Sequence, residues 1–375
     1  MKITYLIDCE PEKNQEEQLF HLLKEVTNYH DIQLICFGET VYYRKIFDLP
    51  LKLIFLSRNS RNTIKAIKNV SALLNEFQPD IIHTRDYRSH ITILPYIIKN
   101  NVKVINNAII DEHMIPRPLK TRIFQKIARI SSHKIVANSY HELQLGRLEE
   151  SDKALVIHKG VDIQHEYSKN SLNQKIQKLL NSFQHNVVMM GSALNSEDFL
   201  SLSKVAKNIL QARDDIGFFI IGYNSRMEKA KNMAGSLINK NIFFLQYNSS
   251  LKDLLPYFDI GIMLNNIHIN SNKIAHIIKE YMAAGLPVVA TKTGVIPELI
   301  EDYKNGVLVK PFSEKQIIES LNLLFNSHKK RKKMADNASN RINDKFKINT
   351  MINKYIDLYE SLITSPSQPT QARPI

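Results

Sequence analysis

Glu280 is the side chain whose sequence context best suits it for chemistry. It belongs to an apolar helix that ends at Gly285, a residue that can adopt the left-handed conformation that terminates helices. A short apolar strand follows at 288–290, and Gly294 provides a tight loop into a new helix at 296–298. Backbone amides at such a helix start point at whatever lies above the strand. The pattern predicts a phosphate-binding crevice with Glu280 on its wall.

Two successive alternations of strands and helices surround this segment. In the first half, stretches with helical periodicity, such as 18–26 and 64–77, separate short β-branched runs. These runs lie at 3–7, 33–37, 52–56, 80–83, 102–105, 134–137 and 155–158. In the second half, helices at 197–213 and 226–238 alternate with runs at 186–190, 217–222, 242–246, 259–264, 287–290 and 306–309. Such alternation predicts parallel sheets with helices on both faces.

The alternation predicts an α/β protein of two doubly wound, Rossmann-like domains. A ligand cleft is then expected at the facing carboxyl ends of the two sheets. Residues 1–163 would form the first domain and 186–347 the second, with the polar, irregular residues 164–185 as the linker. A last helix over 348–363 carries one apolar stripe. The tail at 364–375 contains three prolines and is expected to be disordered.

The bulk composition indicates a cytoplasmic globular protein. The 375 residues suit two domains, and 43% hydrophobic with 23% charged residues is an ordinary balance. No apolar run reaches the roughly 18 residues of a membrane-spanning helix, and Cys9 and Cys36 lack metal-type spacing. The net charge of +13 leaves nucleic acid, an anionic membrane or a solvated basic surface as explanations. The absence of tryptophan and of any known nucleic-acid module disfavours nucleic acid.

Several segments, in the right order, resemble those of GT-B-fold glycosyltransferases of family 4. Residues 78–86 (QPDIIHTRD) are similar to the family's strand that ends in a histidine-rich turn, and 156–162 to the segment that ends its first domain. Residues 218–222 are similar to the strand before the donor-side loop, and 243–259 to the next strand and helix. Residues 270–309 resemble the nucleotide-sugar segment. The resemblance covers nearly the whole chain and implies the GT-B fold, with the last helix crossing back to the first domain.

The resemblance also implies an activity. Members of this family are retaining glycosyltransferases, which move a sugar from a nucleotide-diphosphate sugar to a glycan or lipid-linked acceptor. A role in bacterial cell-surface polysaccharide assembly, at the inner face of the plasma membrane, would follow. No metal or other cofactor is expected, because basic side chains and helix N-termini neutralise the donor diphosphate in this family. A nucleotide sugar and an acceptor are the expected partners, and no nucleic acid.

Candidate site residues follow from the same resemblance. Glu280 would hold the nucleotide ribose, since a carboxylate can accept two hydrogen bonds from a diol. Asn272 stands where the family has a first glutamate, and Asn272 and Lys273 would contact the sugar or the phosphate. His113 would occupy the space of the family's first-domain histidine. The other donor-binding candidates contribute loops and backbone amides: Gly191, Ser192, Gly222, Gly294, Val295, Ile296 and Glu298.

Five features depart from the family's pattern. The first-domain histidine falls at Ala108, and a Gly-Gly loop falls at 13–14, which reads Lys-Asn. The arginine and the lysine that neutralise the diphosphate fall at Ser192 and Asp198, and the first glutamate falls at Asn272. Two functions therefore stay open. One is an active glycosyltransferase with altered donor contacts, and the other is a catalytically silent GT-B partner subunit of a glycan-assembly system.

Other basic side chains are candidates to replace the missing arginine and lysine. Lys204 or Arg226 would reach the diphosphate if the alignment shifts by a few residues. Lys273 and Lys279 lie close to the crevice in the sequence. The alternative for this second pair is that both lysines occupy a solvated helix face.

Residues from Arg117 to Lys134 form a basic amphipathic segment without an acidic residue. Each basic residue near an anionic surface contributes about 1 kcal/mol to binding. The segment predicts docking on anionic lipid, with a core-packed helix as the alternative. Its apolar stripe and its basic residues are Leu119, Ile123, Ile127 and Ile130, and Arg117, Lys120, Arg122, Lys126, Arg129 and Lys134.

Overall fold

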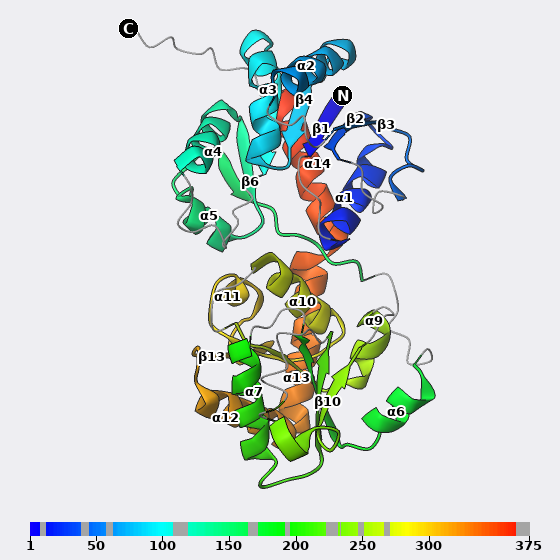
Figure 1. Ribbon diagram of the computed structural model, residues 1–375, viewed down its shortest axis with the longest axis vertical. Coiled ribbons are helices and arrows are strands. Elements are labelled where there is room, and N and C mark those ends of the chain that lie inside the picture. Colours follow the sequence, from blue (N-terminus) through cyan, green and yellow to red (C-terminus); the bar gives the residue numbers. More distant parts are fainter. Residues whose placement is uncertain are drawn as a thin grey trace. The chain divides into compact units, whose positions relative to one another are not determined.

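The computed structural model divides into two compact units (Figure 1). The described residues up to Gly160, together with those from Ile348 onward, form the first unit, and those from Val161 to Lys347 form the second. The structure describes residues 1–7, 13–38, 45–57, 63–107, 119–163, 172–191, 196–222, 232, 234–246, 251–265 and 271–364.

The first unit is built on a parallel sheet of seven strands, in the order β3-β2-β1-β4-β5-β6-β7. Their β-branched, fully apolar runs suit strands that are covered on both faces. The strand order reverses between β1 and β4, where Leu6 lies opposite Thr84. The strands are β1 Lys2–Ile7, β2 Asp31–Phe37, β3 Lys52–Leu56, β4 Ile81–Thr84, β5 Lys103–Asn107, β6 Lys134–Ala137 and β7 Ala154–Val156.

Helices cover both faces of this first sheet (Figure 1). On one face, α1 (Lys13–Val26) and α14 (Ile348–Thr364) pack against β1 and β2. On the other, α2 (Ile64–Phe77) and α3 (Tyr87–Lys99) enclose a second core. The apolar stripe of α14 packs against the sheet, and its Met351, Tyr355 and Tyr359 are buried in the core. Helices α4 (Leu119–Ser131) and α5 (Tyr140–Gly146) complete the unit.

The second unit contains a parallel sheet of six strands, in the order β10-β9-β8-β11-β12-β13. Helices α7 (Ser196–Ile209) and α12 (Glu314–Asn326) pack on one face, where α13 (His328–Arg341) contributes Met334. Helix α10 (Ser271–Ala283) and the π-helix η8 (Ile342–Phe346) pack on the other. The strands are β8 His185–Met190, β9 Ile216–Ile221, β10 Ile242–Leu245, β11 Ile260–Met263, β12 Val288–Thr291 and β13 Gly306–Val309. Two doubly wound α/β sheets confirm the predicted fold class.

Shorter helices complete the second unit, and one of them corrects the predicted linker. Helix α6 (Gln174–Leu180) lies inside residues 164–185, which we expected to be irregular. Its Ile176, Leu179 and Leu180 pack against the core of the second unit, because their spacing places them on one helical face. The remaining short elements are η6 Gly235–Leu237, α9 Leu251–Leu254, η7 Leu255–Tyr257 and α11 Ile296–Leu299.

Two other predictions fall partly outside the described residues. The helix expected at 226–238 has only its end described, where Gly235–Leu237 forms a 3-10 turn. The expected disorder of the tail lies outside the described residues, except that Thr364 ends α14.

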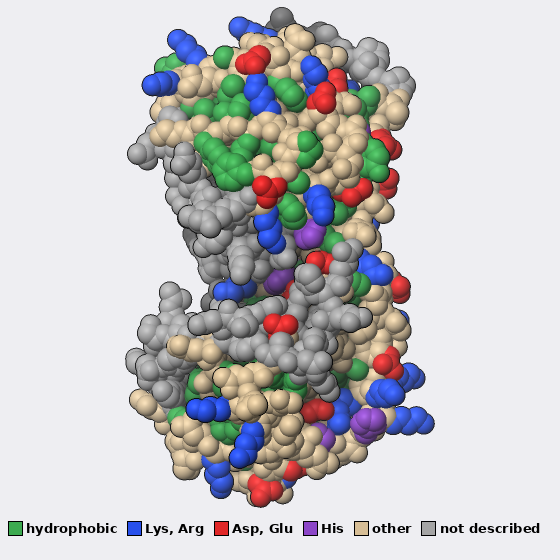
Figure 2. All heavy atoms as spheres, turned by 90° about the vertical axis from the view of Figure 1, so that its right-hand side faces the viewer, with side chains coloured by type: hydrophobic (Ala, Val, Ile, Leu, Met, Phe, Trp, Pro, Cys, Tyr) green, Lys and Arg blue, Asp and Glu red, His purple; other side chains and the backbone are tan. Residues whose placement is uncertain are grey.

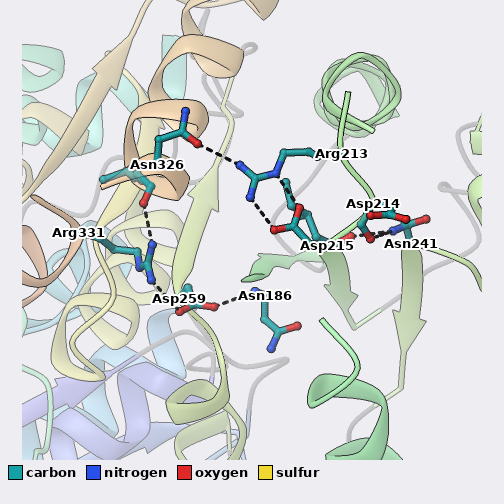
Figure 3. Close-up of polar contacts among 10 residues, drawn as sticks. Asn186, Arg213, Asp214, Asp215, Asn241, Asp259, Asn326 and Arg331 are labelled. Carbon is teal, nitrogen blue, oxygen red and sulfur yellow. Dashed lines mark hydrogen bonds and ion pairs between the residues drawn. The ribbon is translucent and has the colours of Figure 1, made fainter. Parts of the chain in front are cut away.

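The amino-terminal edge of the second sheet is held by a network of paired polar groups (Figure 3). The Asp215 carboxylate accepts from Arg213 Nε at 2.7 Å and from its terminal nitrogen at 2.6 Å. Asp259 accepts from the amide of Asn186 at 2.8 Å and lies 3.7 Å from Arg331. These residues come from loops that precede strands and from helix ends, so the network joins the sheet to its covering helices.

The net charge of +13 is distributed over the protein surface. On the face shown in Figure 2, the described Lys and Arg side chains lie scattered, with Asp and Glu side chains among them. In the part of the chain that the structure describes, no helix is both long enough and apolar enough to cross a membrane.

Candidate nucleotide-sugar site

The segment with Glu280 consists of α10, which follows β11, then β12 and the turn into α11. Gly285 has a φ of 74°, so it adopts the left-handed conformation that was predicted to end α10. The Leu286 amide donates to the Tyr281 carbonyl at 2.9 Å across this turn, and β12 begins at Val288. The helix end, the strand and the Gly294 turn (φ 52°) follow in the predicted order.

Glu280 is a buried carboxylate, with 6% of its surface exposed. His276 lies one turn earlier on α10, and its Nε2 is 3.6 Å from Glu280 Oε1. The sequence analysis missed His276, although its spacing of four residues from Glu280 places both side chains on one helical face. A histidine in this position can hold the carboxylate in a fixed orientation.

The depth of Glu280 depends on how closely α10 approaches the sheet. Gly261 of β11 faces the Tyr281 ring, and a Cβ at this glycine would lie 2.5 Å from that ring. No side chain larger than hydrogen fits this space without moving α10. Tyr281 is fully buried, and burial raises the pKa of its hydroxyl well above its ordinary value. Gly261 therefore allows Tyr281, the residue after Glu280, to pack directly on β11.

The turn after β12 is held by side chains as well as by backbone. Thr291 Oγ1 accepts from the Asn265 amide at 2.9 Å, and Thr293 Oγ1 donates to the Asn265 carbonyl at 3.1 Å. The expectation that amides from Gly294 to Glu298 face a ligand needs correction. The Ile296 amide donates to Thr293 and the Glu298 amide to Val295, because the short helix α11 closes its own turn.

The donor-side loops after β8 and β9 are only partly described. Gly191 is buried at the end of β8. Gly222 ends β9 with a φ of 78°, and its amide donates to the Leu245 carbonyl at 3.0 Å. Ser192 and Arg226 lie outside the described residues. Asp198 is buried in the first turn of α7.

The candidate basic residues occupy very different places. Lys204 is exposed and pairs with Glu314 of α12 at 3.1 Å, so it is engaged away from the sheet edge. Asn272 and Lys273 are partly exposed in the first turn of α10. Lys279 is only 3% exposed, and its Nζ lies 5.1 Å from the centre of the Phe346 ring. The solvated-face interpretation of Lys279 is therefore wrong, because η8 packs over this side of α10.

Comparison with known proteins places this geometry in a family. Residues 170–341 match the sequence model of the family described as Glycosyl transferases group 1. The matched range contains both the second sheet and the Glu280 segment.

Other known proteins are similar to part of this chain in sequence or to most of it in structure. An uncharacterized glycosyltransferase of Methanocaldococcus jannaschii is 24% identical over 172 residues, which is 43% of this chain and 43% of that protein. The chain thus matches less than half the length of this relative. A glycosyltransferase from Rickettsia africae has a similar structure, with a TM-score of 0.76, 18% identity and coverage of 97% of this chain and 99% of that chain. HepE from Anabaena, solved in complex with UDP, has a TM-score of 0.78 at 18% identity, over 96% of this chain and 100% of its own. The chain has the GT-B fold.

In the first unit of this GT-B protein, the candidate site residues are not described. His113 and Ala108 both lie outside the described residues, and 13–14 form the start of α1. His83, from the histidine-containing turn, is fully buried and bonded on both ring nitrogens, to Tyr359 at 2.9 Å and to Asn107 at 2.7 Å. Burial lowers the pKa of His83 to about 3, so its ring is neutral and holds α14 against the sheet.

No group of three or more His, Cys, Asp or Glu side chains among the described residues is arranged to hold a metal ion. The expectation that the reaction needs no metal stays a prediction.

Proposed function

We propose that this protein is a glycosyltransferase that uses a nucleotide-diphosphate sugar as its donor. The observation that carries the proposal is the buried Glu280 of α10, which lies within the residues that match the glycosyl transferases group 1 model. Ligands of open α/β sheets bind outside the carboxyl ends of the strands, and α10 follows the carboxyl end of β11. A carboxylate on this helix can accept both hydroxyls of a ribose.

The neighbouring residues support a donor site in this place. His276 contacts Glu280 and restricts the orientation of its carboxylate. Asn272 and Lys273, on the first turn of the same helix, would contact the sugar or the phosphate. HepE from Anabaena has also been solved with UDP-glucose, at a TM-score of 0.74 and 17% identity to this chain. A uridine nucleotide is therefore the first donor to test.

The finer assignments extend this proposal. We infer that transfer retains the configuration at the sugar, that no metal takes part, and that the acceptor is a glycan or a lipid-linked glycan of a bacterial cell surface. The resemblance of the whole chain to family 4 glycosyltransferases supports these points.

Calorimetric titration with UDP, GDP, ADP and their common sugars tests the donor site. One nucleotide should bind saturably, and Glu280→Ala should weaken its binding roughly 100-fold, because two hydrogen bonds to a carboxylate contribute about 1.5 kcal/mol each. Glu314→Ala, which removes a surface carboxylate on α12, is the matched control and should bind normally. Failure of every nucleotide to bind would refute the proposal.

A catalytically silent GT-B partner subunit is the second candidate. The observation in its favour is the buried Asp198, which stands where the family has a lysine that neutralises the diphosphate. A carboxylate beside a diphosphate repels it. Hydrolysis of the bound donor distinguishes the two functions, since an active transferase releases free sugar slowly without an acceptor. Tight nucleotide binding with no release of sugar would favour the silent subunit.

We also propose that α4 docks on an anionic membrane surface. Its apolar stripe is exposed, with Leu119 at 71%, Ile123 at 48% and Ile130 at 67%. The basic residues Lys120 and Lys126 lie on the same helix and are exposed as well. Exposed apolar side chains between basic ones are the arrangement that binds to lipid headgroups.

Flotation with anionic liposomes tests the α4 surface. Neutral substitution of Lys120, Arg122, Lys126 and Arg129 should reduce the floated fraction at least threefold. The matched control neutralises the exposed basic run at the start of α13, which consists of Lys329, Lys330, Lys332 and Lys333. Equal loss in both variants would assign the effect to net charge alone, and unchanged flotation of the α4 variant would reject α4 as the docking surface.

A further inference from the structure

Arg85 is a buried arginine at the carboxyl edge of the first sheet. It follows β4 directly, and its amide donates to the Leu6 carbonyl of β1 at 3.0 Å. Only 8% of its surface is exposed. The side chain therefore lies where the strand order reverses between β1 and β4, which is the ligand-binding position of open α/β sheets.

The guanidinium of Arg85 has no partner among the described residues. None of their carboxylates forms an ion pair with it, none of their oxygens accepts a hydrogen bond from it, and none of their rings stacks on it. An arginine side chain keeps its charge in proteins, and buried charges are normally paired. An unpaired, buried cation is costly, so its retention calls for a compensating anion.

Two described carboxylates of the same unit, the adjacent Asp86 and Glu142, are bonded to other groups. Asp86 caps α3, where its Oδ1 accepts from the amides of Arg88 and Ser89 at 2.8 Å each. Its Oδ2 accepts from Ser89 Oγ at 3.0 Å. Glu142 of α5 is bonded to Asn138, by the amide at 2.6 Å and by Nδ2 at 3.0 Å. Both acids thus stabilise local backbone structure.

The other groups in electrostatic reach of Arg85 are neutral. The charge of Arg85 acts on His83, Tyr5, Tyr355 and Tyr359, which are all buried. Burial raises the pKa of each of the three tyrosines and lowers the pKa of His83. At neutral pH, none of these side chains supplies a negative charge. Among the residues that the structure describes, the surroundings of Arg85 are polar and carry no counter-ion.

We propose that Arg85 binds an oxyanion, either a phosphate or a carboxylate, carried by the acceptor substrate. A guanidinium presents two parallel N–H groups that match two oxygens of either anion. The assignment to the acceptor rests on the proposed glycosyltransferase function, in which the donor occupies the second sheet. The oxyanion identifies the acceptor class as a phosphoryl-linked lipid or glycan, or as an acidic sugar.

Thermal unfolding at constant ionic strength tests this site, because a ligand that binds only the folded state raises its Tm. The probes are methyl phosphate and glucuronate, with glucose as the uncharged control. Saturating UDP is included to occupy the donor site. We expect one or both anions, and not glucose, to raise the Tm of the wild-type protein. A response to methyl phosphate alone indicates a phosphoryl-linked acceptor, and a response to glucuronate alone indicates an acidic sugar.

Arg85→Met removes the charge and keeps the length of the side chain. We expect it to lose the anion response, to keep UDP binding, and to have a Tm without anion equal to or above that of the wild type. Arg88→Met is the matched control, since Arg88 lies on α3 and bonds to Tyr87, and it should keep the anion response.

Three outcomes overturn the proposal: no anion response in the wild type, an equal response in Arg85→Met, or an equal loss in Arg88→Met. Should Arg85→Met fail to fold, Arg85→Lys decides the matter. We expect its response to fall at least threefold, and an undiminished response would overturn the proposal. Failure of UDP, GDP and ADP alike to bind the wild type would instead count against the proposed function, so the two failures are distinguishable.

Discussion

Arg213 and Arg85 lie at opposite edges of the two sheets and have opposite surroundings. Arg213, at the amino edge of the second sheet, donates to both oxygens of Asp215 and to Asn326 Oδ1, and it lies over the Phe325 ring (Figure 3). Arg85, at the carboxyl edge of the first sheet, is more deeply buried and has no partner among the described residues.

This difference in charge pairing indicates that the two edges have different roles. At the amino edge, the charges of Arg213, Asp215, Asp259 and Arg331 find partners within the protein, so this network contributes to stability (Figure 3). Arg85, at the carboxyl edge of the first sheet, and Glu280 of α10 are buried ionisable groups for which we propose ligands. Natural proteins depart from local pairing rules mainly at functional sites.

The largest effect at the amino edge is expected from Asp259→Ala. This change leaves the Asn186 amide without its acceptor and Arg331, which is 13% exposed, without its carboxylate. We expect the free energy of unfolding to fall by about 2–3 kcal/mol in urea titrations, with UDP binding unchanged. Glu319→Ala on the surface of α12 is the control. A loss of UDP affinity would show that the amino edge also affects nucleotide binding. The two edges would then not have separate roles.

The buried His83, whose pKa is affected by the charge of Arg85, should make the stability of the protein depend on pH. The pKa of His83 in the folded protein, about 3, lies below its ordinary value of 6.5. The unfolded chain therefore binds the proton first, so this contribution to stability is present above about pH 6.5 and is lost as the pH falls toward 3. About 2 kcal/mol should be lost by pH 5. NMR should show His83 neutral at pH 5, and a protonated His83 would contradict this account.

A smaller effect is expected from Arg213→Met. The Arg213 side chain holds the pKa of Asp215 below its ordinary value, mainly by hydrogen bonding. The pair is partly exposed, so its loss should cost about 1 kcal/mol at pH 7. Because the folded pKa is depressed, this contribution is present above about pH 4 and is lost below it. The unfolding free energies of variant and wild type should therefore converge in acid. A constant difference would show that the Phe325 contact, and not the ion pair, is responsible.

The smallest effect is expected from Lys204→Ala. Both partners of the Lys204–Glu314 pair are exposed, and such pairs contribute from about 0 to 1 kcal/mol. We expect unchanged UDP affinity in calorimetry, because Lys204 is engaged on α12. A tenfold loss of UDP affinity would indicate that Lys204 contacts the donor diphosphate. The Lys204–Glu314 pair would then be broken when the nucleotide binds.

The sequence was most informative where a local pattern determines the structure. The end of α10 at Gly285 was predicted because a left-handed residue is required there, and φ is 74°. The helix in 164–185 was missed because its apolar spacing covers only two turns, within a polar segment. The amides of Ile296 and Glu298 were misjudged because a short helix satisfies them within its own turn.

The sequence by itself determined the alternation of strands and helices, the two sheets and the position of Glu280 after the donor-side strands. These features depend on residues that are near one another in the chain. Only the tertiary structure decided that Lys279 is buried against Phe346 and that Arg85 is buried without a partner among the described residues. Burial and charge pairing depend on segments that are distant in the chain, such as α10 with η8, or β4 with α14, and local spacing does not record those contacts.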